Sequence, residues 1–170
     1  NKLKDLDLVI VDESFIGFVS QDEQSLEQEF LNYPNLMIGH RWGKELGILG
    51  IRLGYAISAN KDLNASLRKY LSIWNVNSVA EYILEVLPKY RKEFQTSLAK
   101  VRDDRNYLLE KLKTVSFLTP LNSEANFIFA TLDDLHDSET IKNILFVNDN
   151  ILIKDCGNKT GLRDKKYIRL

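Results

Sequence analysis

The sequence predicts an α/β protein with a smaller α+β region at its carboxyl end, on three observations. The segment DLVIVDES contains a continuous apolar run, which is typical of a buried strand in a parallel sheet covered on both faces. Two more strand-like segments, NLMIGH and GYAISA, alternate with segments of helical spacing. After residue 115, short strands and one helix alternate again, which predicts a small α+β unit.

The amino-terminal region predicts strands joined by helices. After a strand at 9–12, the acidic segment SQDEQSLEQEFLNY has Leu26, Phe30 and Leu31 at helical spacing, and we expect it to form a crossover helix. The segment NKDLNASLRKYLS predicts a further helix, for which Asn60 is a suitable N-cap.

A long helical segment follows. Apolar residues recur at helical spacing from Val79 to about Lys113, and Pro88 predicts a kink or a division into two helices. The preceding WNVN is expected to open the helix, with Asn75 or Asn77 as its cap.

The carboxyl-terminal region predicts strands in VSFLTP, ANFIFATL, ILIKDC and YIRL and a helix in ETIKNILFVNDN. Strand-like residues lie close to both ends of the chain, so we expect it to be part of a longer protein. We divide it into part of a large cofactor-binding domain, an interdomain helical segment and a small carboxyl-terminal domain, at residues 1–75, 76–114 and 115–170.

The composition argues against several classes of partner. The 170 residues carry 23 Lys and Arg against 24 Asp and Glu, and no basic run is interleaved with aromatic residues, so nucleic acid is not an expected partner. Cys156 is the only cysteine and His40 and His136 are the only histidines, so we expect no internal disulfide and no metal site. No apolar run is long enough to span a membrane, and a reducing, cytoplasmic location is expected.

One glycine-rich stretch, GHRWGKELGILGIRLGY, carries the strongest chemical signal. Its four glycines after Trp42 surround Lys44 and Arg52, and glycine lets a backbone approach a bound ligand closely. The apolar residues of 46–53 are expected to desolvate the Lys44 amine, which makes an amine more nucleophilic. A lysine that forms a Schiff base fits these needs, and a solvated surface charge is the alternative. The pattern of a Walker phosphate loop is absent.

Four segments together resemble a known family. VIVDESFIGF, RWGKELGILGIRLGYAI, ANFIFA and YIRL, in this order and spacing, resemble the pyridoxal phosphate-dependent enzymes of fold type I, the class I and II aminotransferases. Within that family the segment ILIKDCGNKTGLRDKKYIRL is most similar to the threonine-phosphate decarboxylases, with the histidinol-phosphate aminotransferases as near relatives. The resemblance implies part of a large, mostly parallel-sheet domain, a small α+β domain, a homodimer, and a chain corresponding to about the carboxyl-terminal half of the family.

The resemblance also implies roles for single residues. Lys44 corresponds to the lysine that forms an aldimine with pyridoxal 5'-phosphate and then moves protons at the substrate carbon. Asp12 would lie beside the pyridine nitrogen and keep it protonated, and Arg52 would hold the phosphate. Arg169 would bind the substrate carboxylate, with Asn126 in the same pocket. Taken singly, Asp12, Asn126 and Arg169 also have purely structural explanations.

Three positions depart from the family pattern. Arg41 and Gly43 replace the Ser or Thr residues that serve the phosphate in many relatives. Arg41 either supplies a second guanidinium to the phosphate or points to solvent. Phe15 replaces a tyrosine that hydrogen-bonds the cofactor's 3-hydroxyl, so that contact is lost or supplied by another residue.

These inferences predict a pyridoxal phosphate-dependent enzyme that acts on an amino acid or an amino-acid phosphate. Decarboxylation, as in the threonine-phosphate decarboxylases, is the first interpretation, and transamination, as in the histidinol-phosphate aminotransferases, is the alternative. A second alternative is that these residues alone are an inactive fragment with a structural or oligomerisation role.

Overall fold

The computed structural model describes residues 3–20, 25–162 and 166–170. The chain forms two compact units, Asn1–Ala99 and Lys100–Leu170, and each is described by itself. The expected mixture of helices and sheets is confirmed, and the division at residues 75 and 114 stays a prediction. Within the described ranges, no helix has both the length and the hydrophobicity needed to cross a bilayer.

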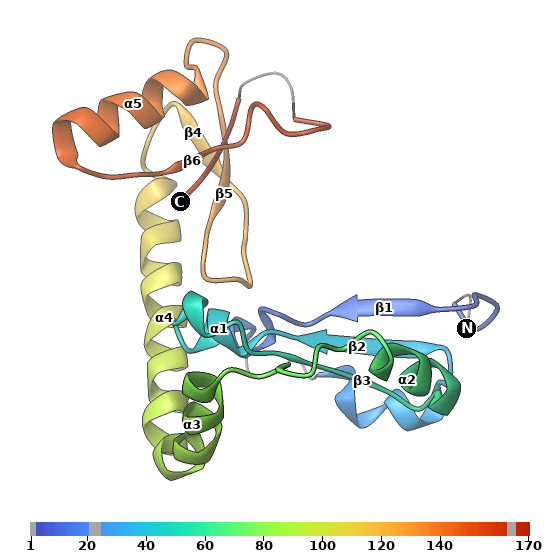
Figure 1. Cartoon of the computed structure of the whole chain (residues 1–170). Coiled ribbons are helices and arrows are strands. Elements are labelled where there is room, and N and C mark those ends of the chain that lie inside the picture. Colours follow the sequence, from blue (N-terminus) through green and yellow to red (C-terminus); the bar gives the residue numbers. More distant parts are fainter. Residues whose placement is uncertain (1–2, 21–24, 163–165) are drawn as a thin grey trace. The chain divides into compact units, whose positions relative to one another are not determined.

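The first unit contains a three-stranded sheet in the order β1-β2-β3 (Figure 1). Strands β1 (Val9–Asp12) and β2 (Leu36–His40) pair in parallel, and β3 (Tyr55–Ser58) pairs antiparallel with β2. All three predicted strands are confirmed. The expected burial of β1 on both faces is wrong, because β1 lies at the edge of this sheet and Ile10 is 65% exposed.

The expected crossover helix between β1 and β2 is also wrong. Its described part consists of two single turns of 3-10 helix, η2 (Leu26–Gln28) and η3 (Phe30–Asn32), and residues 21–24 lie outside the described residues. The Glu13 carboxylate accepts hydrogen bonds from the Ser25 hydroxyl and the Leu26 amide, and the Ser25 hydroxyl accepts one from the Glu27 amide. These side chains satisfy the Leu26 and Glu27 amides and cap the short turn that begins after Ser25.

Two of the helices that follow begin at asparagine caps, as predicted. The side chain of Asn60 accepts a hydrogen bond from the Leu63 amide and starts α2 (Lys61–Arg68). Asn77, not Asn75, caps α3 (Ser78–Val86), because its side-chain oxygen accepts from the Ala80 amide at 3.0 Å. Pro88 lies in a short 3-10 helix, η5 (Leu87–Tyr90), which divides α3 from α4 (Arg91–Leu112), so the predicted interruption is confirmed.

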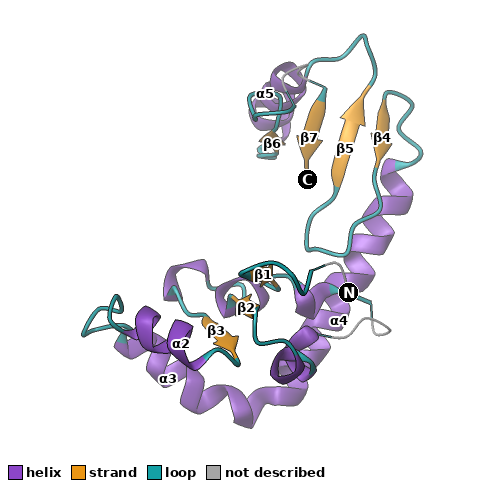
Figure 2. Cartoon of the chain, turned by 90° about the vertical axis from the view of Figure 1, so that its right-hand side faces the viewer, coloured by secondary structure: helices purple, strands orange, loops and turns teal. Residues whose placement is uncertain are grey.

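The second unit is a four-stranded antiparallel sheet in the order β4-β5-β7-β6, with α5 (Ser138–Asp149) beside it (Figure 2). The strands are β4 (Leu118–Pro120), β5 (Phe129–Leu132), β6 (Lys154–Asp155) and β7 (Tyr167–Arg169), as predicted. Its core contains Leu118, Ala130, Leu132, Ile153 and Ile168, and partly buried side chains of α5 pack against it. Cys156 is buried and forms no disulfide.

Candidate active site

The carboxyl ends of β1 and β2 place two of the expected residues at one edge of the sheet. Asp12, the last residue of β1, is paired in register with Gly39, and β2 ends one residue later. The one-turn helix α1 (Trp42–Glu45), which carries Lys44, follows directly. In open α/β sheets this edge, outside the carboxyl ends of parallel strands, is where ligands bind.

Lys44 faces Phe15. The Lys44 Nζ atom lies 4.4 Å from the centroid of the Phe15 ring, and a cation held over an aromatic face is attracted by it. Phe15 comes from the turn that follows β1 and precedes the 3-10 helix η1 (Ile16–Phe18). The ring that stands in place of the expected tyrosine therefore contacts the lysine itself.

The apolar residues around Lys44 shield the loop only in part. Ile51 and Leu53 are buried, 3% and 8% exposed, and pack with Ala80 of α3. Ile48 and Leu49 are 46% and 65% exposed, so the expectation that they desolvate the site is wrong for these two residues. They lie in and beside a 3-10 turn, η4 (Leu49–Ile51), which turns only Ile51 toward the interior.

Two of the four glycines permit close backbone approach. A Cβ atom at Gly54 would lie 2.5 Å from the carbonyl oxygen of His40, and one at Gly43 would lie 3.1 Å from that of Ile48. Gly47 and Gly50 have open space at that position, and their approach to a bound ligand stays a prediction. Gly54 thus lets the chain leaving the lysine loop pass directly against the end of β2.

Asp12 is held as a carboxylate by two neighbours. Its Oδ1 atom accepts hydrogen bonds from the amide and the hydroxyl of Ser14, and its Oδ2 atom lies 2.7 Å from the Arg41 guanidinium. The hydrogen bond from Ser14 is the main cause that lowers the pKa of Asp12, and Arg41 lowers it further. Arg41 therefore pairs with Asp12 in this structure, and its service to a phosphate stays a prediction.

The pKa of Asp12 gives a test of this arrangement. Ser14→Ala is expected to raise the pKa of Asp12 toward the ordinary aspartate value in the cofactor-free protein, because it removes the hydroxyl donor. Since the pKa is lowered in the folded state, the ionised carboxylate stabilises the fold above the ordinary value, and this stabilisation is lost as the pH falls through the lowered pKa. An NMR titration of the Asp12 carboxyl carbon measures it, with Ser66→Ala on exposed α2 as control. An unchanged midpoint in Ser14→Ala contradicts the assignment.

A buried carboxylate beside Lys44 was not predicted as part of the site. The side chain of Glu45 is only 8% exposed, its Oε1 atom accepts a hydrogen bond from the Gly17 amide at 2.7 Å, and its Oε2 atom lies 3.4 Å from His40 Nε2. The His40 ring stacks on Tyr55 with centroids 5.1 Å apart. From the sequence, we considered His40 only for a metal site, which we did not expect, and gave Glu45 no role.

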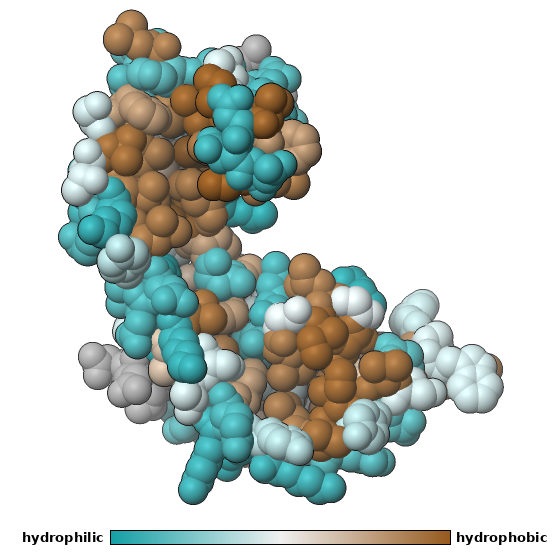
Figure 3. Space-filling view, turned by 90° about the vertical axis from the view of Figure 1, so that its left-hand side faces the viewer, coloured by the Kyte–Doolittle hydropathy of each residue, from teal (hydrophilic) through white to brown (hydrophobic). Residues whose placement is uncertain are grey.

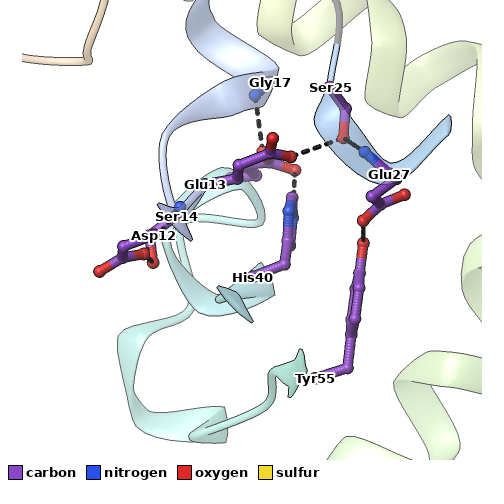
Figure 4. Close-up of polar contacts among 9 residues, drawn as sticks. Asp12, Glu13, Ser14, Gly17, Ser25, Glu27, His40 and Tyr55 are labelled. Atoms are coloured by element: carbon purple, nitrogen blue, oxygen red, sulfur yellow. Dashed lines mark hydrogen bonds and ion pairs between the residues drawn. The ribbon is translucent and has the colours of Figure 1, made fainter. Parts of the chain in front are cut away.

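The electrostatics of this cluster centre on His40 (Figure 4). Burial acts to lower the pKa of His40, but the Glu45 carboxylate outweighs it, with further contributions from Glu27 and Glu13, so this pKa lies above its ordinary value. The Tyr55 hydroxyl donates a hydrogen bond to Glu27, and burial together with this bond raises the pKa of Tyr55. The Tyr55 hydroxyl therefore remains a donor to Glu27 at neutral pH, and the carboxylates around His40 favour its protonated form.

An open groove of about 970 Å³ runs along the sheet of the first unit. Ile10, Asp12 and Arg41 are among the residues that line it, whereas Lys44 and Arg52 are not. Figure 3 shows hydrophobic side chains gathered on the surface of both units. The groove thus combines an ion pair at the sheet edge with an apolar floor.

The second unit holds the two residues expected to bind substrate. The Arg169 guanidinium lies 5.0 Å from the ring centroid of Phe127, and the exposed Asn126 directly precedes that ring in the sequence. Arg105 of α4, which sequence reasoning missed, donates a hydrogen bond to the Ala125 carbonyl and lies 3.5 Å from Glu124. This buried arginine fixes the loop that leads into Asn126.

The side chains of the first unit fit the chemistry of pyridoxal phosphate. Lys44 offers an amine for the aldehyde, and Asp12 offers an ionised carboxylate, 56% exposed, for a ring nitrogen. Arg52 is exposed, and its own backbone is left-handed, with φ 53°. Its guanidinium has no hydrogen bond or ion pair with any other described residue. A free guanidinium suits a phosphate. Among the described residues, no group of three or more histidine, cysteine or acidic side chains is arranged to hold a metal ion.

Comparison with known proteins points to one family. The family model for aminotransferase class I and II matches residues 6–161. The chain is 32% identical to a CMP-5'-(3-aminopropyl)phosphonate synthase of Streptomyces rubellomurinus, covering 96% of this chain and 26% of that protein. It is 30% identical to an L-serine phosphate decarboxylase of Campylobacter jejuni, covering 100% of this chain and 45% of the relative.

Solved structures agree with this fold. A decarboxylase from Sulfurospirillum multivorans superposes with a TM-score of 0.90 and 27% identity over 99% of this chain and 44% of its own. The histidinol-phosphate aminotransferase of Clostridium acetobutylicum gives a TM-score of 0.87 and 29% identity over 95% of this chain and 48% of its own. The chain therefore spans between about a quarter and a half of the length of these relatives.

Proposed function

Because the chain belongs to the aminotransferase class I and II family, we propose that the intact protein is a pyridoxal phosphate-dependent enzyme that uses Lys44 to bind its cofactor. Enzymes of this family depend on pyridoxal phosphate. One observation carries the assignment to these residues: the parallel pairing of β1 with β2 brings Asp12 and the Lys44 helix to the same sheet edge.

Each residue then has a definite task. When bound, the cofactor supplies a ring that accepts the electrons of a bond broken at the substrate carbon. Lys44 binds the aldehyde and moves the proton at that carbon, and the ionised Asp12 keeps a proton on the ring nitrogen. Arg52 holds the phosphate, with Arg41 as a second guanidinium once it shares its contact with Asp12. Phe15 has no hydroxyl to donate, so it supports Lys44 only through its ring.

The substrate is proposed to be an amino acid or amino-acid phosphate whose carboxylate binds Arg169, beside Asn126. The planar fork of an arginine pairs both oxygens of a carboxylate at once. We favour decarboxylation, and the relatives that act on serine phosphate support it. Transamination is the alternative, supported by the similarity to a histidinol-phosphate aminotransferase. The position of the substrate carboxylate decides between them, because the bond that breaks must stand perpendicular to the cofactor ring.

We also propose that the intact protein is longer than this chain, acts in the cytoplasm and forms a homodimer. The open groove along the sheet and the exposed Ile10 support a longer chain or a second subunit that covers them, since an apolar strand face is normally covered. This chain spans less than half of the length of these relatives, which also supports a longer intact protein. On this proposal residues 1–170 alone have no useful turnover.

The test uses the intact protein loaded with pyridoxal phosphate. Borohydride reduction followed by peptide mapping is expected to place the cofactor on Lys44. Carbon dioxide is expected to be released from O-phosphoserine or O-phosphothreonine. Amino transfer from histidinol phosphate to a 2-oxo acid without carbon dioxide would replace decarboxylation by transamination. A protein that takes up no cofactor, or carries it on another lysine, contradicts the proposal as a whole.

A further inference from the structure

We propose that Glu45 is a positioning residue for Lys44, because its buried carboxylate ties the turn that carries Lys44 to the turn that carries Phe15. The inference rests on the proposed function, in which Lys44 binds the cofactor. It concerns the contacts of Glu45 with Gly17 and His40, none of which reaches the reacting atoms.

The helix that presents Lys44 cannot hold its shape alone. It comprises four residues, Trp42 to Glu45, and helices shorter than about 12 residues are marginal in water without tertiary contacts. Its first amide, that of Trp42, donates to the Leu53 carbonyl at 3.1 Å and secures its beginning. Its last residue, Glu45, needs an anchor of its own.

The Glu45 carboxylate supplies that anchor. One oxygen accepts the Gly17 amide hydrogen at 2.7 Å, and the other lies 3.4 Å from the His40 ring nitrogen at the end of β2. The side chains of Glu45 and His40 are each 8% exposed. Hydrogen bonds to a carboxylate are stronger than neutral ones, and a buried carboxylate that loses its partners is costly. The bridge therefore joins α1, the end of β2 and the turn after β1.

Gly17 matches this carboxylate. A Cβ atom at Gly17 would lie 2.5 Å from Glu45 Oε1, so the two residues approach as closely as a glycine allows. Figure 4 shows the Gly17 nitrogen and the His40 ring directed toward the same small region from opposite sides. The three atoms nearest to an added methyl group all belong to the flexible end of the Glu45 side chain, which can shift more cheaply than backbone.

The bridge lies directly next to the cofactor lysine. Lys44 immediately precedes Glu45, and Phe15 lies two residues before Gly17. Holding Glu45 on Gly17 consequently holds the Lys44 amine over the Phe15 ring at 4.4 Å. Reactive groups must be held to within fractions of an ångström for efficient reaction, which is the work of such supporting contacts.

The test compares three variants of the intact protein. Glu45→Ala removes the bridge, Glu45→Gln keeps an oxygen that accepts from the Gly17 amide, and Gly17→Ala pushes the carboxylate away while keeping its charge. Glu85→Gln, an exposed residue of α3, is the matched control. The rate at which pyridoxal phosphate is trapped on Lys44 by pulsed borohydride is the main measurement. Hydrogen exchange of the Gly17 amide in cofactor-free protein is the second.

Glu45→Ala and Gly17→Ala are expected to trap the cofactor on Lys44 about tenfold more slowly than the wild type, the scale of a small misplacement. Glu45→Gln is expected to restore trapping to within about twofold, which a loss of stability alone does not produce. Gly17 exchange should accelerate in Glu45→Ala and stay slow in Glu45→Gln. If Glu45→Ala does not fold, the trapping rate of Gly17→Ala alone tests the inference.

If Glu45→Ala and Gly17→Ala both trap the cofactor at the rate of Glu85→Gln, while the wild-type protein carries the label on Lys44, the inference is overturned and the proposed function stands. If the wild-type protein carries the reduced cofactor on another residue, the proposed function is overturned and this inference with it.

Discussion

Replacing Lys44 by alanine in the intact protein is expected to lower turnover by at least about a hundredfold, the usual scale of a lost proton-transfer group. The substitution removes both the amine that binds the cofactor aldehyde and the base that moves the proton at the substrate carbon. Lys44→Arg is expected to be as inactive, because a guanidinium preserves the positive charge over Phe15 but does not react with an aldehyde at neutral pH. Steady-state turnover and cofactor absorbance measure both variants.

The pair of variants separates chemistry from structure. If Lys44 served only to hold Phe15, Lys44→Arg would keep its activity, since the cation on the ring would remain. Lys69→Ala, an exposed lysine at the end of α2, is the control and should turn over at the wild-type rate. If the turnover of Lys44→Arg lies within a few-fold of that control, Lys44 does not take part in the reaction.

Much of the fold was predictable because strands and caps are local signals. The apolar runs at β1, β2 and β5 and the side-chain caps of Asn60 and Asn77 act within a few residues of one another. The edge position of β1 was not predictable, since an apolar run shows that a strand can be buried and not how many neighbours it has. The helix expected between β1 and β2 did not form, and the contact of the Glu13 carboxylate with the Leu26 amide, 13 residues away, is not recorded in the spacing of apolar residues.

The residues of the candidate site could be selected from local patterns in the same way, and their roles stay predictions. The spacing of Lys44 and Arg52 and the position of Asp12 at a strand end are patterns within single segments. The contact of Glu45 with the Gly17 amide joins residues 28 positions apart, and the contact of Arg105 with Ala125 joins residues 20 apart. The spacing of apolar residues along the sequence gives no sign of such long-range pairs. A glutamate next to the lysine within an apolar loop was the one available signal, because a charged residue there needs a partner.

Arg169 is expected to set substrate affinity through the shape of its side chain as well as its charge. Its guanidinium lies 5.0 Å from the Phe127 ring centroid, which holds the plane of the fork, and a lysine offers neither the fork nor the same stacking. Arg169→Lys is therefore expected to lower kcat/KM for O-phosphoserine by roughly tenfold to a hundredfold, the scale of one charge-assisted hydrogen bond.

The loss should fall on KM rather than on kcat, because a carboxylate clamp that holds substrate and transition state alike contributes uniform binding. Steady-state kinetics of Arg169→Lys are compared with those of Arg91→Lys, an exposed arginine at the start of α4. Cofactor absorbance should be unchanged in both, since Arg169 is assigned to the substrate alone. Equal kinetics in the two variants would assign the substrate carboxylate to another residue. A lower kcat at unchanged KM would instead mean that the guanidinium orients the bond that breaks, since its contact would then strengthen only in the transition state.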